Sequence, residues 1–127
     1  MNYLKREEEL RRAISNACEG KSNEVWKKES GIVLNAIHKI MDLMMEKRMR
    51  DMERRAYMDV FGKEDESMAS EDPDQTIIRV KEQMRIINSM CSKYGTEPMF
   101  PEAMGKADPK TIENAYRTYE RQCREVA

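Results

Sequence analysis

The feature that most constrains this chain is a long segment, residues 24–61, that contains no proline and only one glycine, Gly31. Apolar residues recur in it every three or four positions: Ile37, Met41, Met45, Met49, Met52, Ala56 and Val60. This spacing puts them along one side of an α-helix. Ser22 or Asn23 can cap the start of such a helix, and Gly62 can end it. The sequence therefore predicts one long helix, about 24–61.

The length of this helix raises a packing problem. About 38 residues at 1.5 Å each span roughly 57 Å, whereas a compact domain of this size is about 35–40 Å wide. Either the helix breaks near Gly31, or it stays whole and a partner chain covers the part that protrudes. We favour the whole helix, because the apolar pattern continues on both sides of Gly31.

Three further helices are predicted, over 3–18, over 75–93 and from Pro109 onward. The second is the clearest, with an apolar seam whose steps alternate between three and four: Ile77, Val80, Met84, Ile87 and Cys91. The third begins with Asp108 as an N-cap residue and Pro109 as the first helical residue. Residues 96–107 are expected to form a loop. The fold class is therefore all-α, a single domain over 1–127 built as an elongated four-helix bundle.

Between the long helix and the helix predicted over 75–93 lies a linker over 63–74, in which Lys63 is the only basic residue. Its acidic residues are Glu64, Asp65, Glu66, Glu71, Asp72 and Asp74. Serines and a proline keep this segment irregular, so we expect a solvated acidic linker. The whole chain has a net charge of −1, which gives no general attraction to nucleic acid or to an anionic membrane.

Residues that could carry catalysis are scarce. His38 is the only histidine, and no nucleotide-binding or zinc-protease motif is present. His38, Asp42 and Glu46 are spaced by four and could line up to hold a divalent ion, but a solvated polar stripe is the simpler interpretation. We therefore expect no enzyme activity, no cofactor, no metal site and no small-molecule substrate.

Cysteine usage and hydropathy indicate the cellular setting. Cys18, Cys91 and Cys123 are few, odd in number and far apart, which favours reduced thiols over a disulfide scaffold. No apolar stretch is long enough for a signal peptide or a membrane span. These features predict a cytoplasmic protein that does not bind membranes.

Methionine gives the strongest indication of function. The chain has 12 methionines, and several of them crowd into the long helix, in an arc wider than one packing seam. Methionine side chains adapt to irregular surfaces and are common at protein-binding sites. Core packing against the other helices is the simpler interpretation of these methionines, but the width of the arc favours a further contact, with a protein partner, a second copy of the chain, or both. The candidate protein-binding residues are Met41, Met44, Met45, Met49 and Met52.

A cluster of basic residues on the same helix supports an alternative hypothesis. It consists of Lys47, Arg48, Arg50, Arg54 and Arg55. A basic helix face can contact phosphates, but nearby carboxylates offset part of this charge, and no aromatic residues that could stack on bases lie between the basic ones. Nucleic-acid binding is therefore the second hypothesis, after protein–protein interaction as an adaptor, inhibitor or assembly protein.

The segment from Pro73 to Pro98 resembles part of one family of phage small terminase subunits. The resemblance rests on a helix that leads into a Gly-x-x-Pro turn, here Tyr94-Gly95-Thr96-Glu97-Pro98. It covers about a fifth of the chain. The resemblance implies recognition of DNA ends by an oligomeric ring, as in a DNA-packaging accessory subunit, and it would support the nucleic-acid alternative.

Overall fold

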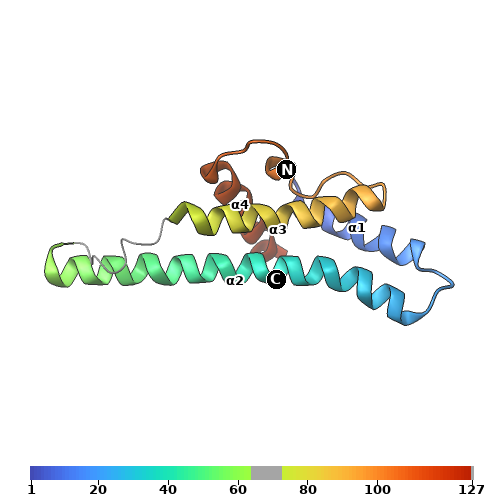
Figure 1. The fold of residues 1–127 in the computed structure, drawn as a ribbon, viewed down its shortest axis with the longest axis horizontal. Helices are drawn as coiled ribbons and strands as arrows, with labels where there is room; N and C mark the ends of the chain where they lie inside the picture. Colours follow the sequence, from blue (N-terminus) through green and yellow to red (C-terminus); the bar gives the residue numbers. More distant parts are fainter. Residues whose placement is uncertain (64–72, 127) are drawn as a thin grey trace.

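The computed structural model describes residues 1–63 and 73–126, with the side chains of 73 and 74 excepted. In this part of the chain all regular structure is helical (Figure 1). The elements are α1 (Tyr3–Ala17), α2 (Asn23–Phe61), α3 (Pro73–Lys93), the short 3₁₀ helix η1 (Pro101–Ala103) and α4 (Pro109–Val126). The prediction of an elongated all-α bundle with one long helix is confirmed.

The long helix is continuous through Gly31. It spans 39 residues, or about 58 Å at 1.5 Å per residue, and ends where Gly62 adopts a left-handed conformation with φ of 66°. The Ser30 hydroxyl donates a hydrogen bond of 2.7 Å to the carbonyl of Trp26, a contact that tends to bend helices. Figure 1 shows α2 bending toward its N-terminal end rather than breaking.

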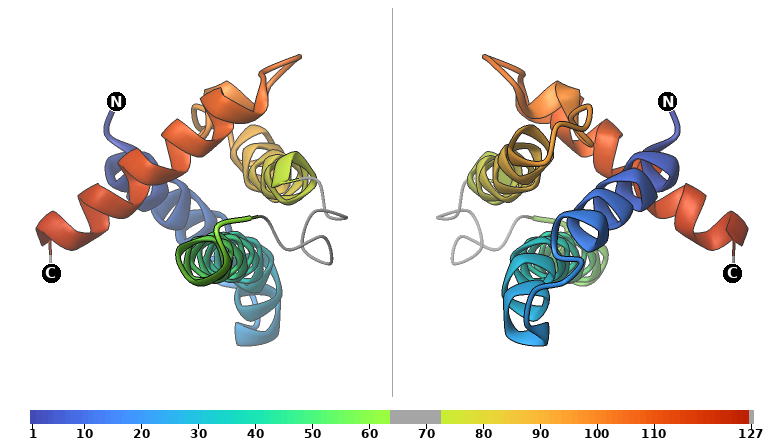
Figure 2. Two further views of the ribbon diagram at one scale, coloured as in Figure 1. Left: turned by 90° about the vertical axis from the view of Figure 1, so that its left-hand side faces the viewer. Right: turned by 90° about the vertical axis from the view of Figure 1, so that its right-hand side faces the viewer.

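Helix α3 runs back along α2 in the opposite direction, while α1 and α4 cross on the same side of α2 (Figures 1 and 2). The predicted seam of α3 is confirmed, since all five of its residues from Ile77 to Cys91 are buried. The start of α4 is confirmed as well, because the backbone N–H of Thr111 donates to the Asp108 carboxylate at 2.9 Å. The Thr111 hydroxyl also donates to this carboxylate, and the two hydrogen bonds, that from the hydroxyl first, lower the pKa of Asp108.

The segment between α3 and α4 closes the core. Asn88 of α3 is buried and bonds both backbone groups of Phe100: its amide donates to the carbonyl at 2.7 Å and its oxygen accepts from the N–H at 3.0 Å. The Phe100 ring stacks on Tyr3 and meets the edge of Tyr119. The helical turn of η1 lies inside the loop expected over 96–107; it directs Ala103 inward and leaves Met104 exposed.

Other expectations have mixed outcomes. The three cysteines are free thiols, as predicted, with Cys18 and Cys91 buried. The helix predicted over 3–18 ends one residue earlier, at Ala17, and Cys18 follows it as the C-cap residue. Of the acidic linker expected over 63–74, residues 64–72 lie outside the described part, and α3 already begins at Pro73. None of the helices described has an apolar stretch long enough to cross a lipid bilayer.

Candidate protein-binding face of the long helix

Helix α2 contributes to the core only through its middle. Its buried residues are Val33, Ala36, Ile37, Ile40 and Met44. All of them belong to the hydrophobic core, and the other three helices lie on one side of α2 (Figure 2). Met44 is 2% exposed, so its side chain fills the core and is not available to a partner. It therefore leaves the set of candidate binding residues.

The other four candidate methionines are exposed. Met41, Met45, Met49 and Met52 expose 43% to 67% of their surface, and Leu34 of the same helix exposes 40%. At 100° per residue these five side chains fall within an arc of about 80°, over a length of about 27 Å. We call this surface the methionine face. It is a second apolar side of α2, separate from the side that enters the core.

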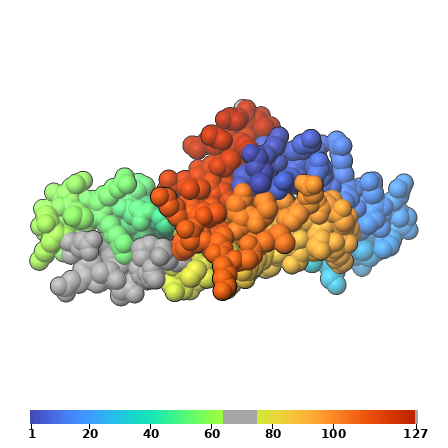
Figure 3. Space-filling view, turned by 90° about the horizontal axis from the view of Figure 1, so that it is seen from above, coloured from blue at the N-terminus to red at the C-terminus, as the bar shows by residue number. Residues whose placement is uncertain are grey.

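The methionine face is most open toward the C-terminal end of α2. No residue of α2 beyond Met44 is buried, and Figure 3 shows this part of the helix, in green, extending past the body formed by α1, α3 and α4. The protrusion predicted from helix length is therefore present among the described residues.

Charged residues border the methionine face on both edges. Asp42, Glu46 and Glu53 follow the edge nearer α3, where Asp42 and Glu46 share a shallow groove with Lys39, Arg79 and Glu82. The opposite edge, toward α4, carries Arg48 and Arg55, both exposed. Of the residues that directly flank the face, those on the edge nearer α3 are therefore mainly acidic, with Lys39 beyond them, and those on the other edge are basic.

Two residues of the predicted basic cluster are engaged by carboxylates of the same chain. The ammonium of Lys47 lies 3.1 Å from Asp51 and 3.3 Å from Glu113 of α4. A terminal nitrogen of Arg48 lies 2.6 and 2.7 Å from the two oxygens of Glu120. This contact raises the pKa of Arg48 and is the main cause that lowers the pKa of Glu120. Lys47 and Arg48 thus attach α2 to α4.

The remaining three basic residues do not form one patch. Arg50 donates to the hydroxyl of Thr76 in α3, and Arg54 is half-buried. Arg55 is exposed on the basic edge. The basic cluster is therefore spread over several sides of α2. Helix α4 supplies the carboxylates of Glu113 and Glu120, which contact Lys47 and Arg48.

The row of His38, Asp42 and Glu46 runs along the exposed side of α2. All three residues are exposed. At 100° per residue, each step of four advances the side chain by 40°, so the row spirals across the helix surface. In the described part of the chain, no group of three His, Cys, Asp or Glu side chains is arranged to hold a metal ion.

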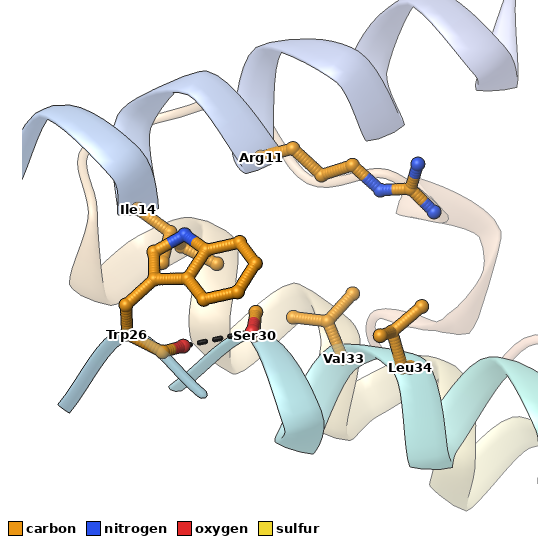
Figure 4. Close-up of a pocket in the computed structure, with 6 residues that line it drawn as sticks. All are labelled: Arg11, Ile14, Trp26, Ser30, Val33 and Leu34. Carbon is orange, nitrogen blue, oxygen red and sulfur yellow. Dashed lines mark hydrogen bonds between the residues drawn. The ribbon is translucent and has the colours of Figure 1, made fainter. Parts of the chain in front are cut away.

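An apolar hollow of about 230 Å³ lies between α1 and α2, at the N-terminal end of the methionine face. Trp26 lies beside Ile14 at one end, Val33 and Leu34 form the floor, and Arg11 crosses above (Figure 4). Trp26 is 45% exposed. The sequence hypothesis missed this hollow, although a single tryptophan in a chain with 6% aromatic residues was a usable signal.

Comparison with known proteins gives no relative. No protein-family model matches the chain, and neither the curated proteins nor the solved structures include a significant match. The resemblance of residues 73–98 to small terminase subunits receives no support from these comparisons.

Proposed function

We propose that this chain is a non-enzymatic interaction module that binds a protein partner through the methionine face of α2. The observation that carries this proposal is that α2 has two apolar sides, of which the fold buries only one. Contiguous exposed apolar patches are rare on monomeric proteins and usually mark interaction sites. Flexible methionine side chains suit a surface that must adapt to a partner.

Nucleic-acid binding has less support. Lys47 and Arg48 are held by Asp51, Glu113 and Glu120, so a phosphate would have to displace carboxylates that the chain itself supplies. The two hypotheses also differ in salt dependence. Binding to phosphates weakens steeply as salt rises, whereas binding through the methionine face, where apolar contacts dominate, should weaken much less.

The test is a paired capture experiment. Immobilised wild-type chain and a double variant, Met45→Glu with Met52→Glu, are exposed to the same cell lysate at low and at high salt, and the retained proteins are identified by mass spectrometry. We expect a protein retained by the wild type at both salt concentrations and lost from the variant. Both substituted side chains are largely exposed, and glutamate favours helix about as well as methionine, so the variant should fold.

The matched control adds the same two negative charges elsewhere, as Ser15→Glu with Asn114→Glu, at exposed positions of α1 and α4. This control should retain the partner. Equal retention by the wild type and the methionine variant would exclude the methionine face as the binding site. Retention of nucleic acid that is lost at high salt would favour the basic cluster instead.

A further inference from the structure

The two edges of the methionine face carry opposite charges, so the face is complementary to a second copy of itself. We propose that the face binds a second copy of this chain, with the two α2 helices parallel and related by a two-fold axis that runs along them. This inference rests on the proposed function and names its partner. It also fixes an orientation, which the exposure of the methionines alone does not.

The orientation follows from symmetry and charge. A two-fold axis parallel to the helices brings the basic edge of each copy against the acidic edge of the other. An axis perpendicular to the helices makes them antiparallel, and it brings acidic against acidic and basic against basic. Edge charges set the orientation of paired helices, and like charges across a contact are unfavourable. The separation of Asp42, Glu46 and Glu53 from Arg48 and Arg55 therefore favours the parallel arrangement.

The spacing of individual residues agrees with this arrangement. Arg48 precedes Glu53 by five residues, which is the offset at which edge residues meet across parallel paired helices, so Arg48 of each copy would face the partner's Glu53. The Arg48 side chain is 51% exposed despite its contact with Glu120, and a guanidinium has five N–H donors. It can therefore keep the contact within its own chain and bind the partner as well.

The body of the molecule leaves room for a second copy. Helices α1, α3 and α4 are gathered on the other side of α2 (Figure 2), so two bodies would point away from each other across the paired helices. Asp59 ends the methionine face toward the C-terminus of α2. The contact is therefore about 27 Å long, which is small for a protein interface. Small interfaces belong to weak and reversible complexes, so the dimer should dissociate on dilution.

The first measurement is sedimentation equilibrium of the full chain over a range of concentrations. We expect a reversible monomer–dimer equilibrium for the wild type. The Met45→Glu/Met52→Glu variant should sediment as a monomer throughout, while the Ser15→Glu/Asn114→Glu control should dimerise like the wild type. A Glu53→Lys variant should dimerise at least tenfold more weakly, whereas Glu19→Lys, the same charge change in the turn after α1, should have no effect.

The second measurement gives the orientation. A spin label is attached at Val60→Cys in a Cys123→Ser background, in which the two remaining cysteines are buried. Parallel helices packed about 10 Å apart bring the two labels close together. Antiparallel helices paired at the middle of the methionine face would place them about 50 Å apart. A short interlabel distance supports the proposal, and a long one overturns it.

A wild-type chain that remains monomeric at the highest concentration also overturns the proposal, as does a dimer that the methionine variant leaves intact. Neither result bears on the capture experiment, in which a different protein can cover the same face. Conversely, equal capture by the wild type and the methionine variant would contradict the proposed function itself. The two failures are therefore distinguishable.

Discussion

At the scale of single residues, the methionines of α2 divide into two classes that their sequence positions do not reveal. Met44 and Met45 are neighbours, yet one is buried and the other is 61% exposed. Successive helical residues differ by 100° in direction, and this step is enough to move a side chain from the core to the methionine face. The role of each methionine is therefore set by its angle on the helix.

This division predicts different effects of truncation on stability. Met44→Ala should lower the free energy of unfolding by about 2–5 kcal/mol, because it removes buried atoms and leaves a cavity. Met49→Ala should change it by no more than about 0.5 kcal/mol, as is usual for exposed positions. Urea denaturation followed by circular dichroism, at a dilution where the chain is monomeric, measures both. Similar losses for the two variants would mean that Met49 also packs inside the fold.

At the scale of elements, the continuity of α2 through Gly31 determines how far the helix protrudes. A glycine in a helix interior costs up to about 1 kcal/mol relative to alanine. A Cβ added at Gly31 would meet no other atom within 4 Å. The helix therefore tolerates Gly31 without needing it for close packing.

We predict that Gly31→Ala stabilises the chain by about 0.5–1 kcal/mol. Gly62→Ala is the contrasting variant, because Gly62 ends the same helix with a positive φ of 66°. An alanine there should cost roughly 1–2 kcal/mol. Thermal unfolding of the two variants against the wild type measures the difference. A loss of stability in Gly31→Ala would show that α2 requires the conformational freedom of glycine at this position.

At the scale of the whole molecule, α4 holds α2 in place through carboxylates. Glu120 contacts Arg48, and it also accepts a hydrogen bond of 3.1 Å from the hydroxyl of Tyr116. Burial, together with the neighbouring Glu120, raises the pKa of Tyr116 to about 12. Glu113, about two helical turns before Glu120, contacts Lys47. The two contacts between α2 and α4 join positions that are more than 60 residues apart in sequence.

The Arg48–Glu120 contact makes stability depend on pH. The pKa of Glu120 is lowered in the folded chain, so its contribution to stability is present above the ordinary value of 4.5 and is lost as the pH falls through the lowered pKa. Glu120→Gln should therefore flatten the loss of unfolding free energy below about pH 4.5. Glu125→Gln, which removes an exposed carboxylate paired with Arg121 at 3.8 Å, should leave the pH profile unchanged. Identical profiles for the wild type and Glu120→Gln would contradict this role.

The sequence alone determined the helices and several of their ends. Local rules were sufficient: Gly62 ends α2, Asp108 caps α4, and the seam from Ile77 to Cys91 follows the helical period. These features depend on backbone conformation and on spacing within one segment, which a sequence records directly.

Only the tertiary structure decided which apolar side of α2 enters the core. Periodicity fixes the angle between the two sides, but which one is covered depends on contacts with α1, α3 and α4. The same holds for Lys47 and Arg48, whose partners Glu113 and Glu120 come from α4, and for the hollow beside Trp26, which needs both α1 and α2. Contacts between distant segments decide which side of α2 stays exposed as the methionine face, and spacing within one helix does not encode such contacts.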